Sequence, residues 1–259
     1  MTISYDGTGF GGWQVQPNST SIQSLIQKAL STILKEETHV IGSGRTDAGV
    51  HALGQTAHFE TKKPLQIRSL QYSLNGLLPK QVRILNILQV SDDFHARFSA
   101  TGKIYHYHLH LDPVLNPFTR LYSFHVHHKV DINLLKEASS LFLGTKDFTA
   151  FTNENHKGSA AKNAIRTLHR IDIVSEPGGA RLEFEADGFL YKMVRNITGS
   201  LLDICAGLIS LSDIPHIFTS RDRKNAGKTA LPHGLFLMHV HYPEEISSTY
   251  DSLQRLHKT

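Results

Sequence analysis

The chain has 259 residues, of which 40% are hydrophobic and 19% are charged, and its formal net charge at pH 7 is +4. This composition is typical of a folded globular protein and excludes a disordered chain. No apolar run reaches the ~18 residues that a membrane-spanning helix needs. The single cysteine, Cys205, excludes an internal disulfide and a multi-cysteine zinc site. We therefore expect a soluble, cytoplasmic protein whose modest positive charge is compatible with nucleic acid without requiring it.

The first half of the chain alternates strand-like and helix-like patterns. Apolar residues spaced three and four apart, among them Ile22, Ile26 and Leu30, predict a helix that begins after the cap-competent residues 19–21, Ser-Thr-Ser. The elements expected in this half are strands over residues 2–5, 38–41, 54–60 and 82–90 and helices over residues 22–34 and 65–78, the second with Leu70, Leu74, Leu77 and Leu78 buried. This order is that of a ferredoxin-like split βαβ unit, which has an antiparallel sheet with helices on one face.

A polar stretch over residues 91–101 separates this unit from a second one, which repeats the plan with longer insertions. Its expected elements are strands over residues 104–111, 167–175, 181–186 and 235–241 and helices over residues 133–143 and 193–204. We expect Leu182, Phe184 and Ala186 to face the core because they alternate with charged residues. The sequence therefore predicts two ferredoxin-like or RRM-like α+β domains over residues 1–98 and 99–242, followed by a C-terminal tail over residues 243–259.

A glycine-rich segment joins the strands expected over residues 38–41 and 54–60. It reads Gly42-Ser-Gly-Arg-Thr-Asp-Ala-Gly-Val-His-Ala-Leu53, and connections of about twelve residues are uncommon unless they are functional or mobile. Arg45 and Asp47 are two residues apart, so they project to the same side of an extended segment. A guanidinium keeps a neighbouring carboxylate ionised, and an ionised, partly desolvated aspartate is a competent nucleophile. The alternative is that Asp47 only caps a turn.

Several ordered motifs accompany this loop. They are Tyr5-Asp-Gly-Thr8, Gly12-Trp-Gln14, Gly44-Arg-Thr-Asp-Ala-Gly-Val-His-Ala52, Gly54-Gln55, His58-Phe59, Asp93-Phe-His-Ala-Arg-Phe-Ser-Ala100, Lys103-Ile-Tyr-His-Tyr107, Asp147-Phe-Thr-Ala-Phe151, Gly188-Phe-Leu-Tyr-Lys-Met-Val-Arg-Asn-Ile197, Ala226-Gly227, Thr229-Ala230 and Gly234-Leu-Phe-Leu237. Together they closely resemble the motifs of the TruA family of tRNA pseudouridine synthases. The resemblance covers almost the whole chain, and its motifs follow one another at family-like spacing.

The resemblance implies an isomerase that converts uridine to pseudouridine in the anticodon stem-loop of tRNA, at positions 38, 39 and 40, without a cofactor or a metal. It implies that Asp47 is the catalytic aspartate and Arg45 the arginine that accompanies it. The family's active-site tyrosine and helix arginine fall on Tyr105 and Arg195, and Leu235 matches a small apolar residue that borders the base. Three roles stay open for the aspartate, namely attack on C1′, attack on C6 of the base and abstraction of the 2′ proton.

Two positions depart from the family pattern. Lys228 stands where a proline is usual, and Leu231-Pro-His233 alters the segment that precedes Gly234. Both departures lie close to Leu235 in the sequence, so they bear on the local geometry around that residue.

The reaction sets physical requirements for the site. The detached uracil must turn in a dry pocket, where the Tyr105 ring can stack on it for ~1–3 kcal/mol and its hydroxyl can act as acid or base at C5. The alternative for Tyr105 is an ordinary aromatic residue on a strand face. The nucleotide must also be flipped out of its stem, which calls for phosphate contacts that hold the distorted arm. Arg195 lies on a predicted helix, where an unpaired charge is costly to bury, so we expect it to pair with Asp47 or with an RNA phosphate. The candidate phosphate contacts are Arg97, Lys103, Lys192, Arg221, Arg223 and Lys228.

The resemblance also implies the assembly of the two domains. Their antiparallel sheets are expected to join side by side into one continuous sheet with the helices on one face, the pseudouridine synthase fold, with a basic cleft centred on Asp47. The expected partners are tRNA, through its anticodon arm, and a second copy of the chain in a homodimer. Neither a membrane nor a metal is expected as a partner.

Two other functions compete with this interpretation. Histidines alternate on three strands, as His106, His108 and His110, as His125 and His127, and as His239 and His241. Such rows can bind zinc or iron in a metal-dependent hydrolase, although no carboxylate or cysteine accompanies them at metal-site spacing. A non-catalytic RNA-binding protein of two RRM-like domains is the other alternative, although no stretch matches the aromatic motif with which such domains stack bases.

Overall fold

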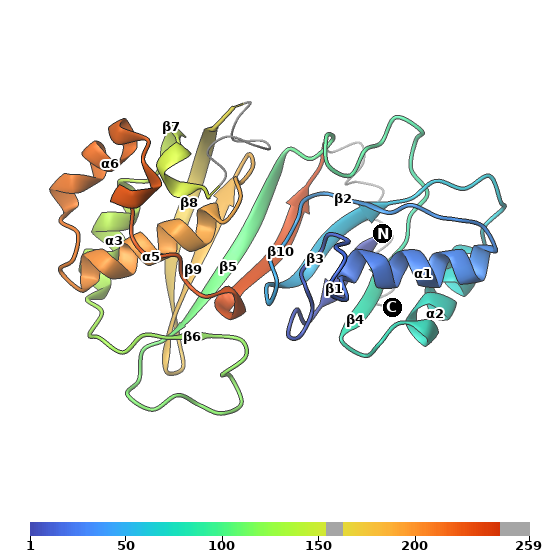
Figure 1. Cartoon of the computed structure of the whole chain (residues 1–259), viewed down its shortest axis with the longest axis horizontal. Helices are drawn as coiled ribbons and strands as arrows, with labels where there is room; N and C mark the ends of the chain where they lie inside the picture. The colour runs from blue at the N-terminus through green and yellow to red at the C-terminus, as the bar shows by residue number, and fades with distance from the viewer. Residues whose placement is uncertain (154–162, 244–259) are drawn as a thin grey trace, which may run out of the picture. The chain divides into compact units, whose positions relative to one another are not determined.

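The computed structural model describes residues 1–153 and 163–243 (Figure 1). By internal contacts the chain divides into two compact units, one comprising Met1–Gly102 with the residues from Leu237 on, and the other comprising Lys103–Phe236. Apart from Pro243, the C-terminal tail expected over residues 243–259 lies outside the described residues. No helix in the described ranges combines the length and the apolar character needed to cross a bilayer.

The first unit has the predicted split βαβ order. Its elements are β1 (Thr2–Tyr5), α1 (Ile22–Leu34), β2 (Ile41–Gly42), β3 (His51–His58), α2 (Ile67–Leu77) and β4 (Val82–Asn86). β1 lies between β3 and β4 and is antiparallel to both, and β2 pairs with the end of β3. One face of this sheet is buried through alternating residues such as Ile3, Tyr5, Val82 and Ile84. The two helices cover that face (Figure 1).

Helix α1 has the bounds predicted from its apolar spacing. The Ser21 side chain caps it by accepting a hydrogen bond from the backbone N–H of Ser24, and the Ser24 side chain accepts from the N–H of Ser21. The backbone N–H groups of Ile22 and Gln23 donate to the carbonyl oxygens of Gly12 and Trp13. The helix start therefore anchors the Gly12-Trp-Gln14 motif.

The expected bounds of three strands in the first unit are wrong. β2 covers Ile41–Gly42 rather than residues 38–41, because polar side chains of α1 satisfy the backbone there. Gln27 accepts from the Val40 N–H, and Gln23 donates to the Val40 carbonyl. β3 covers His51–His58 rather than residues 54–60, and its earlier start shortens the glycine-rich connection to residues 43–50. β4 ends at Asn86 rather than at residue 90.

Helix α2 is also shorter than expected, and one of its predicted core residues is exposed. It covers Ile67–Leu77 rather than residues 65–78. Leu70 and Leu74 are buried as predicted, whereas the Leu77 side chain is 54% exposed. The backbone becomes extended at Leu78, and this turn out of the helix carries the Leu78 side chain, rather than that of Leu77, into the core.

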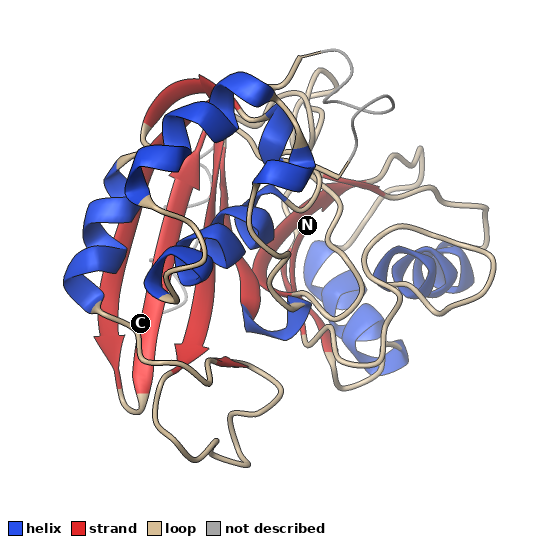
Figure 2. Ribbon diagram, turned by 60° about the vertical axis from the view of Figure 1, so that its left-hand side comes forward, coloured by secondary structure: helices blue, strands red, loops and turns tan. Residues whose placement is uncertain are grey.

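The second unit repeats the plan with added elements. It contains β5 (Gly102–His110), β6 (Phe124–His125), α3 (Ile132–Ser140), β7 (Gly144–Asp147), β8 (Ile165–Glu176), β9 (Gly179–Ala186), α5 (Met193–Cys205) and α6 (Ile214–Ser220). Four strands form an antiparallel sheet in the order β5-β9-β8-β7, and β6 runs parallel to β5. Helices α3 and α5 pack together on one face of this sheet (Figures 1 and 2). β6, β7 and α6 are not among the elements predicted from the sequence.

The core of the second unit lies between this sheet and its helices. Leu182, Phe184 and Ala186 of β9 are fully buried, as their alternation predicts, and so are Met193 and Ile197 of α5. Helix α3 ends at Ser140, three residues before the expected end. The chain then forms successive turns, in which the N–H groups of the next residues donate to carbonyls three positions earlier.

The strand β10 (Leu235–His241) has the predicted bounds and passes from the second unit into the first. From Leu237 on it lies beside β3, so closely that a Cβ on Gly54 would overlap the carbonyl oxygen of Met238. By internal contacts this part of the strand belongs to the first unit, whereas the limits expected from the sequence assign it to the second. The difference arises because a strand's own sequence does not specify which neighbour it pairs with.

Candidate active site

The loop that carries Arg45 and Asp47 covers residues 43–50 between β2 and β3. It closes with a turn in which the Val50 N–H donates to the Asp47 carbonyl at 3.1 Å. Gly49 occupies this turn with φ at 77°, a backbone conformation that favours glycine. Thr46 is buried, and its Oγ1 lies 2.8 Å from the Tyr5 hydroxyl. Its neighbours differ from it in burial, because Arg45 is exposed and Asp47 is half-buried.

The N-terminal motifs hold this loop from one side. Gly12 has φ at 88°, and a Cβ on it would lie 2.5 Å from the Thr46 carbonyl oxygen. The next residue, Trp13, donates its backbone N–H to that same carbonyl at 3.0 Å. A Cβ on Gly7 would overlap the Val50 carbonyl. Both glycines are therefore required for close packing of backbone on backbone, which fixes the loop on either side of Asp47.

Strand β3 holds the loop from the other side. Gln55 is fully buried, accepts from the Ser43 hydroxyl at 2.7 Å and donates to the Gly44 carbonyl at 3.0 Å. His51 is buried, and its Nδ1 accepts from the Gly7 N–H at 3.0 Å. These side chains and the glycines at 7 and 12 make the loop a preorganised support for Asp47 rather than a flexible connection.

Arg195 lies in the second unit, on α5, with 8% of its surface exposed. Its Nε donates to the Ala230 carbonyl at 2.7 Å, and the Ala230 N–H donates to the Arg195 carbonyl at 3.1 Å. The neighbouring Tyr107 donates its hydroxyl to the Leu231 carbonyl at 2.7 Å. Burial raises the pKa of Tyr107, and the positive charge of Arg195 partly opposes that rise. The phenol is therefore neutral beside the guanidinium at physiological pH.

Tyr105 and Leu235 are the other predicted site residues of the second unit. Tyr105 lies on β5 with 7% of its surface exposed, and the edge of its ring meets Phe189 at a centroid distance of 5.0 Å and an interplanar angle of 82°. Leu235 is buried at the start of β10, directly after a 3₁₀ turn over Pro232–Gly234. Pro232, which lies in the segment that departs from the family pattern, opens this turn.

The six candidate phosphate contacts differ in their exposure and in their bonds within the protein. Arg97, Arg221 and Lys228 are exposed, and Lys103 and Lys192 are half-buried. The Arg221 Nε nevertheless lies 2.9 Å from an oxygen of Asp147. Arg223 differs most, because its Nη2 donates to Asn196 Oδ1 at 3.0 Å and to Thr229 Oγ1 at 2.8 Å.

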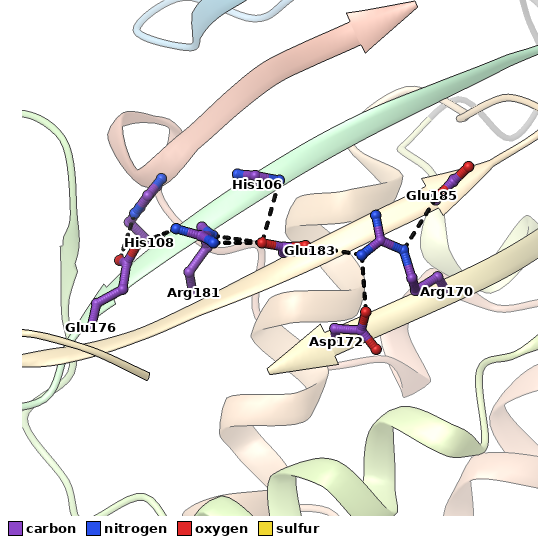
Figure 3. A network of polar contacts seen from close by, with 8 residues as sticks. All are labelled: His106, His108, Arg170, Asp172, Glu176, Arg181, Glu183 and Glu185. Atoms are coloured by element: carbon purple, nitrogen blue, oxygen red, sulfur yellow. Dashed lines mark hydrogen bonds and ion pairs between the residues drawn. The ribbon is translucent and has the colours of Figure 1, made fainter. Parts of the chain in front are cut away.

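Two of the alternating histidines of β5, His106 and His108, belong to a network of charged side chains (Figure 3). By alternation along the strand they lie on the sheet face opposite Tyr107. His108 Nδ1 lies 2.8 Å from a Glu176 oxygen, and His106 Nε2 lies 3.7 Å from a Glu183 oxygen. Burial lowers the pKa of His106, against the attraction of Glu183. Within residues 1–153 and 163–243, no three potential ligands are arranged to hold a metal ion. The geometry therefore assigns His106 and His108 to pairs with carboxylates.

The predicted site residues thus fall into two sets. Arg45 and Asp47 share one loop of the first unit, and Tyr105, Arg195 and Leu235 lie in the second. The sequence did not single out Tyr107, which contacts the segment bonded to Arg195. A signal for it exists, because it lies two residues after Tyr105 on the same face of a strand.

The family of the chain follows from comparison with known proteins. A family model described as tRNA pseudouridine synthase matches residues 1–99 and 138–243. The tRNA pseudouridine synthase A 1 of Protochlamydia amoebophila is 54% identical over 246 residues, which cover 95% of this chain and 96% of that protein. The tRNA pseudouridine synthases A of Acetivibrio thermocellus and Chlamydia muridarum are each 41% identical, over 93% and 94% of this chain and 98% and 91% of their own lengths.

These matches include the loop of Asp47 and elements of both units, and they define the class as that of the pseudouridine synthases, which are isomerases. Within this class, the chain belongs to the tRNA pseudouridine synthase A (TruA) family. The resemblance of the sequence motifs and the predicted α+β fold class are both confirmed.

Proposed function

We propose that Asp47 is the catalytic residue with which this enzyme isomerises uridine to pseudouridine in the anticodon stem-loop of tRNA, at positions 38, 39 and 40. The observation that carries the proposal is that other parts of the first unit hold the loop of Asp47 in a fixed position. Backbone contacts at Gly7 and Gly12 and hydrogen bonds from Gln55 fix the segment around Asp47. A preorganised carboxylate is what differential stabilisation of a transition state requires, because no reorganisation is then needed during the reaction.

The reaction requires the protein mainly to position the nucleoside and the reacting groups. The N1–C1′ bond breaks, the uracil turns, a C5–C1′ bond forms, the proton leaves C5 and N1 gains a proton, so nothing is oxidised and no phosphate is consumed. We propose that Arg45 accompanies Asp47, that Tyr105 stacks on the base and that Arg195 pairs with an anionic group. We further propose that Leu235 borders the base. The low exposure of Tyr105, Arg195 and Leu235 supports a site from which water is excluded.

Tritium release from 5-tritiated uridine in an anticodon-arm transcript tests the role of Asp47. The wild type should release tritium, and Asp47→Asn should abolish release while RNA binding persists. Asp92→Asn is the matched control, because Asp92 is an exposed aspartate of the same unit outside the loop. Release by Asp47→Asn would contradict the catalytic role, and binding without release by the wild type would favour a non-catalytic RNA-binding protein. Transcripts with a single uridine at 38, 39 or 40 then resolve the positions.

We also propose that the enzyme acts as a homodimer in which one tRNA touches both subunits. Sedimentation equilibrium should give about twice the chain mass of 28.9 kDa, and titration with tRNA should then yield a complex that contains both subunits. A species of single-chain mass that turns over substrate at the same rate would contradict this proposal.

A further inference from the structure

An exposed aromatic side chain in the first unit is held in a defined position. Phe98 lies in the polar stretch that follows β4, and its side chain is 77% exposed. Its ring nevertheless stacks on the ring of His95, with 4.3 Å between centroids and 28° between planes. What distinguishes Phe98 is therefore the fixed position of an exposed ring, whose outer face is available to stack on another ring.

The turn that carries this stack is closed by its own hydrogen bonds. His95 Nδ1 accepts from the backbone N–H groups of Arg97 at 3.1 Å and of Phe98 at 3.2 Å. Ser99 donates its N–H to the His95 carbonyl at 2.9 Å, and its Oγ accepts from the His95 N–H at 3.0 Å. The imidazole therefore both supports the Phe98 ring and fixes the backbone on which that ring is carried.

The turn is anchored to the sheet through its middle residue. Ala96 is fully buried, its N–H donates to His58 Nδ1 on β3 at 3.1 Å, and its carbonyl accepts from the Tyr242 hydroxyl at 2.6 Å. The His95 ring also packs on the edge of the His58 ring at 4.8 Å. The stack is thus preorganised, and ordering it for a ligand costs little conformational entropy.

A positive charge lies beside the ring. The guanidinium carbon of Arg97 is 5.7 Å from the centroid of Phe98, and Arg97 is itself exposed. A fixed aromatic face next to an exposed cation is the combination with which proteins bind unpaired nucleotides, because the ring stacks on the base and the cation pairs with a phosphate. This complementarity favours single-stranded RNA over an apolar protein surface, which would gain nothing from the guanidinium.

We propose that residues 95–98, which we call the Phe98 platform, form a second RNA contact outside the catalytic loop. An unpaired base of the tRNA stacks on Phe98, and Arg97 pairs with a neighbouring phosphate. The proposal rests on the proposed function in that the RNA is the tRNA substrate, but it adds a stacking residue and a place on the enzyme that the catalytic set does not include.

Binding of the anticodon-arm transcript tests the platform, with all variants made in the Asp47→Asn protein so that the RNA is not turned over. Phe98→Ala should raise Kd about 5- to 150-fold, since stacking on an aromatic ring is worth ~1–3 kcal/mol per base. Phe98→Tyr should bind within about twofold of the parent, because the π face is retained. Tyr72→Ala is the matched control, because Tyr72 on α2 is an aromatic residue of the same unit with 85% of its surface exposed.

A transcript series identifies the stacked base. Each loop nucleotide of the transcript is replaced in turn by an abasic one. At one position this replacement should weaken binding to the Asp47→Asn protein, and at that position it should not weaken binding to the Phe98→Ala variant beyond the loss that Phe98→Ala already causes. Arg97→Gln should reduce the slope of log Kd against log salt by about 0.7, the value for one phosphate contact on a single strand. Additive losses at every abasic position would overturn the stacking assignment.

Other outcomes would also overturn the platform. These are an unchanged Kd for Phe98→Ala, an equal loss in Tyr72→Ala, or a change of oligomeric mass in Phe98→Ala without a change in RNA binding. Failure of the proposed function has a different signature. If the wild type releases no tritium but Phe98→Ala still weakens RNA binding, the platform stands and the catalytic proposal fails.

Discussion

Arg195 and Ala230 exchange two hydrogen bonds, from Arg195 Nε to the Ala230 carbonyl at 2.7 Å and from the Ala230 N–H to the Arg195 carbonyl at 3.1 Å. Two further bonds join the same segment to α5, because Gly227 N–H donates to the Ser200 hydroxyl at 2.9 Å and Thr229 donates to Asn196 at 2.7 Å. The position of the buried Arg195 guanidinium therefore depends on close packing of residues 226–230 against α5.

Gly199→Ala should separate this segment from α5. A Cβ on Gly199 would overlap the Lys228 carbonyl oxygen, and neither backbone can move without loss of the bonds between Arg195 and Ala230. We expect a loss of about 1–3 kcal/mol in the free energy of unfolding, the usual cost of overpacking, and a lower kcat. Urea denaturation and tritium release measure the two effects.

Gly76→Ala is the control for that substitution. Gly76 lies inside α2, and a Cβ on it would have no neighbour within 4 Å, so alanine should stabilise the helix by up to about 1 kcal/mol through its higher propensity. Equal stability changes in the two variants would show that the contact between Gly199 and Lys228 does not constrain the segment.

Arg223 should behave as a positioning residue rather than as a phosphate contact. Its guanidinium bonds to Asn196 and Thr229, and burial lowers its pKa against the attraction of Asp203. Arg223→Gln should therefore lower kcat and leave KM for the transcript and its salt dependence nearly unchanged. Arg221→Gln provides the comparison for KM and its salt dependence, because the exposed Arg221 side chain is accessible to an RNA phosphate. A higher KM with a reduced salt slope in Arg223→Gln would assign that side chain to RNA instead.

The example of Arg223 shows where sequence reasoning stops. A basic residue in an RNA-modifying enzyme suggests a phosphate contact, but its partners Asn196 and Thr229 are not adjacent to it in the chain, and only the fold brings them together. The same holds for residues 38–40, which have strand-like composition but bond to side chains of α1. Nonlocal partners decide both cases, and a local pattern contains no information about them.

Elements with a strong local signal were predicted with the correct bounds. The bounds of β1, α1 and β10 match, because alternation or three-and-four spacing with a cap defines them locally. In the candidate site, the glycines at 44 and 49 and the Arg45–Asp47 spacing pointed to the loop. The support from Gly7 and Gly12 was not predicted, because it arises from backbone contacts between segments distant in sequence.

The stability of the Phe98 platform should depend on pH through His58. Burial is the main cause that lowers the pKa of His58 from 6.5, His95 and the N-terminal amine lower it further, and Glu60 opposes them. The folded state therefore keeps the imidazole neutral, which lets Nδ1 accept from the Ala96 N–H. As the pH falls below 6.5, the unfolded chain binds a proton that folded His58 does not, so this contribution to stability is lost.

His58→Asn isolates that contribution, because Oδ1 of asparagine can accept from Ala96 but does not titrate. The difference in unfolding free energy between pH 7.5 and pH 5.5, measured by urea denaturation, should be smaller in His58→Asn than in the wild type. The binding of RNA should also weaken less on acidification in this variant. Parallel pH profiles for the two proteins would show that His58 does not control the turn.

Glu183 should be the main stabilising carboxylate of the charged network on the second sheet (Figure 3). It pairs with both Arg170 and Arg181, at 2.9 and 2.6 Å, and its side chain is 14% exposed. Burial acts to raise its pKa, but the hydrogen bonds from Arg181 and Arg170 and the attraction of His106 outweigh burial, so the pKa lies below 4.5. Its contribution is therefore present above pH 4.5 and lost as the pH falls through the lowered pKa.

Glu183→Gln should lower the free energy of unfolding at pH 7 by about 1–3 kcal/mol, because it replaces hydrogen bonds to a charged group, worth about 1.5–3 kcal/mol each, by neutral ones worth about 1 kcal/mol. Asp172→Asn should cost less than about 1 kcal/mol, since Asp172 is 53% exposed and pairs with Arg170 alone among the residues in Figure 3. The deficit of Glu183→Gln should shrink as the pH falls through the lowered pKa of Glu183, because the wild-type carboxyl then becomes protonated as well. Urea denaturation at pH 7 and at a series of lower pH values checks this. A deficit that stays constant over the whole series would mean that packing, rather than charge, gives Glu183 its effect.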